Sequence, residues 1–124
     1  MNLKSRFRRS QNRTSGPAGE RTAEAYLSKK SWKTITRNYS CRFGEIDLIM
    51  ADGDSIVFVE VKNRKNEDFT PAETIITYPK KKRLTLTAKH FISEYRIKDR
   101  PLRFDAVIIT GKEIRHYRNA FSPA

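Results

Sequence analysis

The sequence predicts an α/β domain with a mixed central sheet flanked by helices. Residues 18–30 and 80–95 repeat apolar side chains at helical spacing, whereas residues 45–51, 55–62 and 102–110 show the alternating or continuous apolar pattern of strands. Helical and extended segments are interleaved in the order helix, three strands, helix, strand and a final edge strand. This order is typical of α/β folds.

The first segment suits a helix of about three turns. Pro17 is favourable at a first helical position, and Ala23, Tyr26 and Leu27 follow at helical spacing. Glu20 lies three residues before Ala23 and seven before Leu27, so we expect it on or beside the face that packs on the core. A carboxylate is costly in that position unless a positive group meets it.

Three strands are expected next. Residues 32–39 are rich in β-branched side chains and lead into a loop that contains Arg42. Residues 45–51 and 55–62 alternate apolar and polar side chains, and the ADGDS between them is a hairpin turn signal. The segment 55–62 should therefore run antiparallel to the one before it.

A helix and one or two strands complete the fold. Leu84, Ala88, Phe91 and Tyr95 form an apolar stripe at steps of three and four, and Pro79 is expected as a break before this helix. The strand 102–110 then leads through the turn at Gly111 and Lys112 into an edge strand over residues 113–118.

The chain is expected to fold as one domain with a basic tail. It has 124 residues and a hydrophobic content of 37%, which suffices for one modest core. Residues 1–15 have few apolar side chains and no acid, so they predict a flexible basic tail in front of a single domain over residues 16–124.

The charge balance favours a polyanionic partner. Lysine and arginine number 26 against 14 acids, which gives a net charge of +12. Nucleic acid is the expected partner, because counterion release drives its binding to basic surfaces. The alternative is a basic protein whose charge only keeps it soluble. Binding to a membrane surface is not favoured, because the sequence offers no basic helix with bulky apolar anchors. The single cysteine, Cys41, excludes an intramolecular disulfide and favours a cytoplasmic protein.

Two neighbouring strands carry a charged face. Glu60 and Lys62 point to the same side of their strand, about 6.5 Å apart along it. If Gly53 and Asp54 are the central turn residues, Asp47 lies directly across from Glu60, and if the turn is centred one residue earlier, Asp47 lies on the diagonal. Either register brings the three side chains onto one face, whereas an odd-numbered turn without a bulge would separate them.

Two carboxylates and a lysine on one face indicate metal-assisted phosphate chemistry. Adjacent carboxylates repel each other unless they share a proton or a cation. Asp47 and Glu60 offer hard oxygen ligands, which suit Mg²⁺ or Mn²⁺, and Lys62 could orient a water or neutralise developing charge. The alternative is a cross-strand salt bridge at the surface, since Glu-x-Lys is common by chance.

Several motifs together resemble a known family. The motifs are GERTAEAYL (19–27), RN (37–38), GEIDLI (44–49), VFVEVKNR (57–64) and RFDAVII (103–109). In their order and spacing they resemble the YraN-like family of small bacterial proteins. That family is assigned to the PD-(D/E)XK nuclease superfamily and is similar to archaeal Holliday-junction resolvases. The resemblance covers residues 16 to about 121, and GEIDLI combined with VFVEVKNR is specific.

The resemblance implies a restriction-endonuclease-like core and a Mg²⁺- or Mn²⁺-dependent endodeoxyribonuclease. Asp47 matches the metal-binding aspartate, Glu60 and Lys62 match the Glu-x-Lys element, and Glu20 matches a helical glutamate that assists metal binding. The carbonyl of Val61 would be the backbone ligand. Similarity to resolvases extends the expected substrates to branched or otherwise structured DNA, and it makes a homodimer one expectation.

Basic side chains near this face are candidates for nucleic-acid binding. They lie in the loop before the hairpin, just beyond the Glu-x-Lys element and at the start of the second helix, and they are Arg42, Arg64, Lys65, Lys80, Lys81, Lys82 and Arg83. Asp105 could join the acidic site or pair with a basic residue from a helix. Neither His90 nor His116 has a partner at metal-ligand spacing.

Two other functions stay open at this point. The chain could retain the nuclease fold as a catalytically silent nucleic-acid-binding protein, in which the carboxylates serve structure. It could also be a ribosome-associated or assembly protein, an interpretation that rests on charge alone and predicts no dependence on divalent metal.

Overall fold

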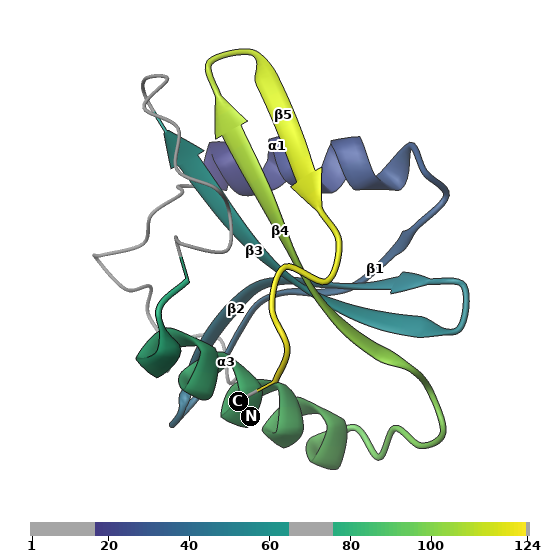
Figure 1. Ribbon diagram of the computed structural model, residues 1–124. Coiled ribbons are helices and arrows are strands. Elements are labelled where there is room, and N and C mark those ends of the chain that lie inside the picture. Colours follow the sequence, from purple (N-terminus) through teal and green to yellow (C-terminus); the bar gives the residue numbers. More distant parts are fainter. Residues whose placement is uncertain (1–16, 65–75, 124) are drawn as a thin grey trace.

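The computed structural model describes residues 17–64 and 76–123 (Figure 1). The predicted tail over residues 1–15 and the candidate Lys65 lie outside the described residues. The elements in chain order are α1 (Pro17–Ser28), β1 (Lys33–Cys41), β2 (Gly44–Asp52), β3 (Ser55–Arg64), α3 (Tyr78–Glu94), β4 (Leu102–Thr110) and β5 (Glu113–Tyr117).

The five strands form one mixed sheet in the order β1-β2-β3-β4-β5. Neighbouring strands are antiparallel except for β3 and β4, which are parallel. A parallel pair needs a crossover connection, and α3 lies within it (Figure 1). The predicted α/β class, its order of elements and its mixed sheet are therefore confirmed.

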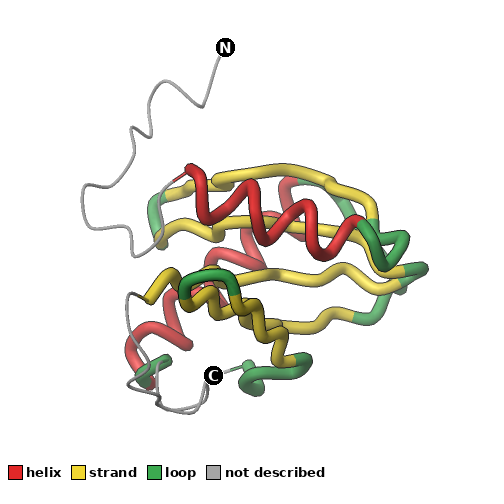
Figure 2. The backbone as a smooth tube through the Cα atoms, turned by 90° about the horizontal axis from the view of Figure 1, so that it is seen from above, coloured by secondary structure: helices red, strands yellow, loops and turns green. Residues whose placement is uncertain are grey.

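The two helices cover opposite faces of the sheet (Figure 2). Ala23 and Leu27 of α1 are buried in one cluster with Val57 and Val59 of β3. Phe91 of α3 belongs to a second cluster. Because side chains alternate along a strand, β3 is apolar on both sides and contributes to both clusters.

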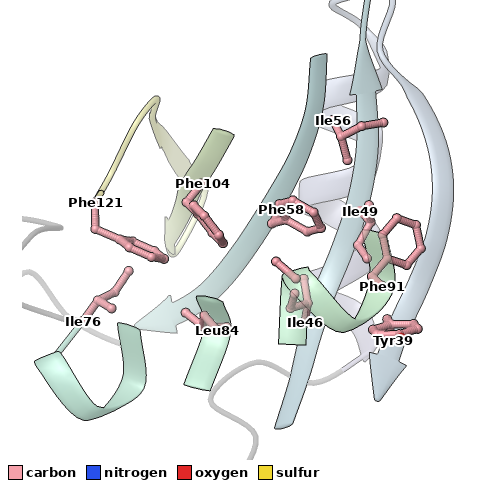
Figure 3. Close-up of a cluster of buried hydrophobic side chains, with 11 residues drawn as sticks. Tyr39, Ile46, Ile49, Ile56, Phe58, Ile76, Leu84, Phe91, Phe104 and Phe121 are labelled. Atoms are coloured by element: carbon pink, nitrogen blue, oxygen red, sulfur yellow. The ribbon is translucent and has the colours of Figure 1, made fainter. Parts of the chain in front are cut away.

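The α3 side of the sheet holds most of the aromatic core (Figure 3). Phe58 stacks on Phe104 with ring centroids 5.3 Å apart, and its ring meets Phe91 edge-on at 6.1 Å. Phe58 and Phe91 are almost completely buried. Each such side chain contributes about 1.5–3 kcal/mol through burial, so this cluster holds α3 firmly on the sheet.

The helix boundaries differ slightly from the prediction. The first helix ends at Ser28, two residues early, and the chain then turns through Ser31 with a positive φ of 70°. The second begins at Tyr78 behind an N-cap at Thr77. Pro79 therefore lies inside the first turn, where its missing N–H is no loss, and not in front of the helix as predicted.

A side-chain clamp fixes α1 to β1. Thr34 Oγ1 donates to Glu24 at 2.5 Å, and Arg37 Nε donates to the same carboxylate at 2.9 Å. The hydrogen bond from Arg37 lowers the pKa of Glu24, against the opposing effect of burial. Neither helix in the described part of the chain is long and apolar enough to cross a membrane.

Candidate active site

The β2–β3 hairpin adopts the first of the two predicted registers. Asp52 pairs with Ser55, so Gly53 and Asp54 are the central turn residues, and Gly53 has the positive φ of 60° that this turn requires. The recorded pairs end where Leu48 meets Val59. The next residues on the two strands are Asp47 and Glu60, and both carboxylates lie close enough to act on Lys62 and on Lys80.

Asp47 lies where the pairing between β2 and β3 ends. The backbone N–H of Val61 donates to Asp47 Oδ2 at 2.8 Å, so a side chain takes the place of a ladder carbonyl as acceptor. Asp47 is 9% exposed and Glu60 is 7% exposed. The hydrogen bond orients the Asp47 carboxylate at a buried point of the sheet.

Lys80 of α3 forms an ion pair with Glu60. Its Nζ lies 2.5 Å from Glu60 Oε2, and the side chains of Lys80 and Glu60 are 25% and 8% exposed. Sequence reasoning placed Lys80 among the phosphate-binding residues and missed this contact. The missed signal is helical spacing, because Lys80 lies four residues before the buried Leu84 and eight before the buried Ala88, and so continues the inward-facing stripe.

The two lysines at this face differ in how tightly they hold their protons. Burial and the charge of Lys80 lower the pKa of Lys62 to about 8, although Glu60 and Asp47 act in the opposite direction. Burial also opposes the charged form of Lys80, but the negative charge of Glu60 and the hydrogen bond to it outweigh burial and raise the pKa of Lys80. Lys62 is therefore the lysine that loses its proton more easily.

The turn between β1 and β2 brings further positive charge beside α3. Gly44 has a φ of +151°, and a Cβ placed on it would come within 3.3 Å of Thr87 Oγ1 and 3.9 Å of Arg83 Cβ. Glycine therefore lets the turn approach the helix closely. The exposed Arg42 of this turn lies over the ring of Phe43, 4.9 Å from its centroid.

The other predicted basic residues are accessible to differing degrees. Lys82 and Arg83 are exposed on the first turns of α3, whereas Lys81 is half-buried and its Nζ lies 6.0 Å from the centre of the Phe121 ring. Arg64 is half-buried at the end of β3, two residues beyond Lys62. The exposed residues Lys82 and Arg83 lie at the same end of α3 as Lys80.

Glu20 reaches the sheet from the other side. It lies in the first turn of α1 and is 5% exposed. Since α1 packs on the side of β3 that carries Val57 and Val59, it covers the face opposite Glu60 and Lys62. Over residues 17–64 and 76–123, no three His, Cys, Asp or Glu side chains gather closely enough to hold a metal. The role of Glu20 in metal binding stays a prediction.

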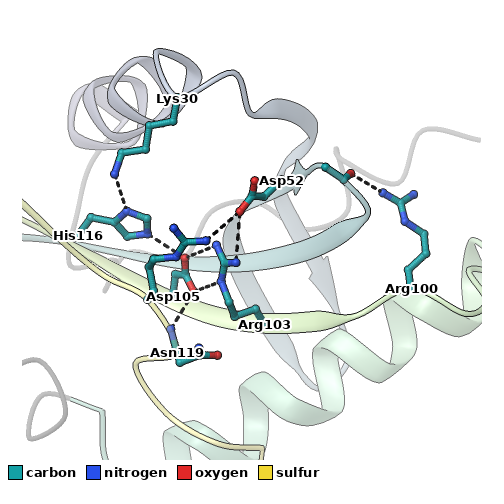
Figure 4. A network of polar contacts seen from close by, with 9 residues as sticks. Lys30, Asp52, Arg100, Arg103, Asp105, His116 and Asn119 are labelled. Carbon is teal, nitrogen blue, oxygen red and sulfur yellow. Dashed lines mark hydrogen bonds and ion pairs between the residues drawn. The ribbon is translucent and has the colours of Figure 1, made fainter.

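Asp105 does not join this site. It pairs with Val59 across the parallel β3–β4 ladder, so its side chain points to the α1 side. It is completely buried and accepts from Arg103 Nε at 2.9 Å and from the N–H of Asn119 at 3.1 Å, while His116 Nε2 lies 2.8 Å from its other oxygen (Figure 4). Its basic partner is thus a residue of its own strand, and not one from a helix.

The network around Asp105 links β4 to the end of β2, to β5 and to the residues that follow α1. Arg103 also donates to Asp52 at 3.2 Å, and Lys30 Nζ lies 3.2 Å from His116 Nδ1 (Figure 4). Burial raises the pKa of Asp105, but the hydrogen bonds from His116, Arg103 and the backbone of Asn119 outweigh it and lower that pKa overall.

The donor set of the charged face fits a hard divalent cation. The carboxylates of Asp47 and Glu60 would offer oxygen ligands, as would the carbonyl of Val61, and the contact with Lys80 places a positive group next to Glu60. Mg²⁺ and Mn²⁺ are commonly held by one or two carboxylates together with waters and substrate phosphates. Asp47 and Glu60 satisfy that requirement without a third acidic residue.

Comparison with known proteins identifies relatives over almost the whole chain. A family model described as "Uncharacterised protein family UPF0102" matches residues 19–109. A UPF0102 protein of Nitrosomonas eutropha is 43% identical over 113 residues, which cover 90% of this chain and 97% of the relative. A relative from Nitrosospira multiformis is 45% identical, and the match covers 88% of this chain and 93% of the relative. A relative from Legionella pneumophila is 42% identical, and the match covers 86% of this chain and 92% of the relative.

Proposed function

The chain belongs to the uncharacterised protein family UPF0102, and from this membership and its charged face we propose that it is a metal-dependent nuclease that cleaves DNA. One observation carries the proposal. Asp47 and Glu60 lie at neighbouring positions where β2 and β3 stop pairing, with Lys62 on the same face. The match supports the family that the motifs resemble, and the relation to PD-(D/E)XK nucleases is part of the proposal.

The proposed roles follow from the chemistry of each side chain. Asp47, Glu60 and the carbonyl of Val61 would hold Mg²⁺ or Mn²⁺, and the bound metal would lower the pKa of a water and place positive charge against the phosphate. Lys62 would orient that water or neutralise charge that develops on the phosphate, and burial lowers its pKa from the ordinary value. Glu20 is proposed to support the site from α1.

The proposed substrate is DNA held through its phosphates. The chain carries a net charge of +12, and Arg42, Lys82 and Arg83 are exposed beside the charged face. Guanidinium and ammonium groups at such positions bind phosphate oxygens and fix the position of a strand without reading its sequence. This supports binding governed by the shape of the DNA, including branched forms.

A second candidate function has its own support. The ion pair of Lys80 with Glu60 neutralises one of the two carboxylates, as expected for a catalytically silent protein that binds nucleic acid through the same basic surface. In such a protein Asp47 would have a structural role, accepting the Val61 N–H and stabilising the charged forms of Lys62 and Lys80. The two functions differ in whether a divalent cation is needed.

Cleavage of a DNA panel tests the proposal. Labelled single-stranded, duplex, flap and four-way-junction DNA would be incubated with Mn²⁺ and wild-type protein, Asp47→Asn or Lys62→Ala. Asp54→Asn is the matched control, because it removes an exposed acid at the hairpin turn, away from the site. We expect cleavage by the wild type and the control and none by the other two. A wild type that binds the panel and cuts none of it would favour the silent binding protein.

A further inference from the structure

Lys80 is placed in the core-facing stripe of α3 although it is charged. The stripe continues through Leu84 and Ala88, both of which are buried. Only about a quarter of the Lys80 side chain is exposed, and its ammonium group ends 2.5 Å from Glu60 Oε2. An ammonium on this stripe loses much of its hydration, so the position is favourable only because a carboxylate meets it.

We infer that Lys80 is a tethered counter-ion that shields Glu60 until a divalent cation takes its place, and that the released ammonium then binds the substrate phosphate. The inference rests on the proposed function, because it assigns Glu60 to a metal site. It makes Lys80 a positioning residue of that site, on a different element from the strands that supply the carboxylates.

Competition follows from charge at close range. An ammonium in contact with Glu60 Oε2 and a divalent cation at the same carboxylate would repel each other strongly in a site shielded from water. Metal binding therefore requires the Lys80 ammonium to leave Glu60.

The released ammonium has a nearby use. Lysine carries its charge on a flexible four-carbon stem, and Lys80 lies at the exposed end of α3 next to Lys82 and Arg83. A phosphate at the metal would offer the ammonium a new anionic partner. Metal and DNA should therefore bind cooperatively, each promoting the change that favours the other.

Titration of Mn²⁺ into the full chain without nucleic acid tests the first half of the inference. The proteins are the wild type, Lys80→Gln, Lys80→Met, Lys80→Arg, Lys82→Gln and Glu60→Gln, each checked for folding by circular dichroism. Removing the competing charge should tighten Mn²⁺ binding about tenfold, because the free energy of one charge-assisted hydrogen bond corresponds to roughly a tenfold change in affinity. Lys80→Arg and the exposed control Lys82→Gln should bind Mn²⁺ as the wild type does.

Salt separates direct competition from a general field effect. At about 0.5 M NaCl, charges that are not in contact are largely screened. The tighter binding by Lys80→Gln should persist under these conditions. An equal gain in Lys82→Gln, or a gain that disappears in salt, would overturn the inference.

DNA binding tests the second half. With Ca²⁺ as a divalent cation in place of Mn²⁺, fluorescence anisotropy should show that the cation strengthens wild-type binding to labelled DNA relative to EDTA. This strengthening should fall several-fold in Lys80→Gln and stay unchanged in Lys89→Gln, which changes an exposed lysine of α3 that is not among the proposed phosphate-binding residues. Full strengthening in Lys80→Gln would overturn the role in phosphate binding.

The variant Glu60→Gln distinguishes failure of the inference from failure of the proposed function. If it loses Mn²⁺ while Lys80→Gln gains no affinity, the metal site stands and only the inference fails. If Glu60→Gln binds Mn²⁺ as the wild type does, the metal is not held at Glu60, and both the proposed function and the inference are overturned.

Discussion

The change Asp105→Asn should destabilise the protein severely without touching the proposed site. Asp105 is completely buried and faces two hydrogen bonds from Arg103, one from the Asn119 backbone and one contact with His116. Asparagine keeps the shape but removes the charge and turns an NH₂ group toward these donors. Removing one partner of a buried ion pair costs about 3–5 kcal/mol, a large part of the total stability of a small domain.

Urea denaturation followed by circular dichroism measures this loss. The control is Asp54→Asn, since Asp54 is exposed at the β2–β3 turn and its side chain has no ion pair in the part of the chain that the structure describes. We expect the control to stay within about 0.5 kcal/mol of the wild type. A loss below about 1 kcal/mol for Asp105→Asn would refute the view that this network holds the α1 side of the sheet together.

The pH dependence of stability provides a second check on Asp105. Its pKa is lower in the folded protein than the ordinary value of 3.8. The unfolded chain therefore binds the proton more readily, so the stabilisation is fully present above that ordinary value and is lost as the pH falls through the folded pKa. The difference in stability between the wild type and Asp105→Asn should accordingly shrink in acid, and a constant difference down to about pH 2 would contradict the assignment.

Three further predictions concern the proposed site and its surroundings. Asp47→Asn should abolish cleavage yet keep the fold, because its amide oxygen can still accept the Val61 N–H, whereas Asp47→Ala should lose about 1–3 kcal/mol in a thermal melt through an unpaired buried donor. Gly44→Ala should lose about 1–3 kcal/mol by the same measurement, since alanine is strained at a φ of +151° and its Cβ would press on Thr87; an unchanged melting temperature would show that the turn adapts. Arg83→Ala should reduce the slope of log affinity against log salt for duplex DNA by about 0.9 per lost phosphate contact, and an unchanged slope would place Arg83 outside the interface.

The elements were predictable because each has a strong local signal. Strands β2 and β3 alternate in hydrophobicity around an obvious turn, and the stripe of α3 repeats at helical spacing. The exact register was not predictable, because turns centred on Gly53 with either neighbour satisfy the same alternation. The structure decides between them by pairing Asp52 with Ser55.

The faces of more distant residues needed the assembled sheet. The side chosen by Asp105 depends on its pairing with Val59 across a parallel ladder whose partner strand is far away in sequence. Likewise, the side from which Glu20 approaches depends on which face α1 covers. Lys80 differs from these, because its spacing from Leu84 already indicated an inward position and was hidden only by the surrounding run of positive charges.

The two buried carboxylate clusters differ in a way that favours function for one and structure for the other. Asp105 is held by backbone and side-chain donors on both oxygens, so a cation could bind it only by breaking that network. Glu60 is held by the flexible Lys80, a partner that can be exchanged. Apolar residues of similar size usually provide as much stability as a buried ion pair. Stability alone therefore does not explain why a charged pair, Glu60 and Lys80, occupies this position. An exchangeable charge beside Asp47 and Lys62 is what a site that binds cations and phosphates requires.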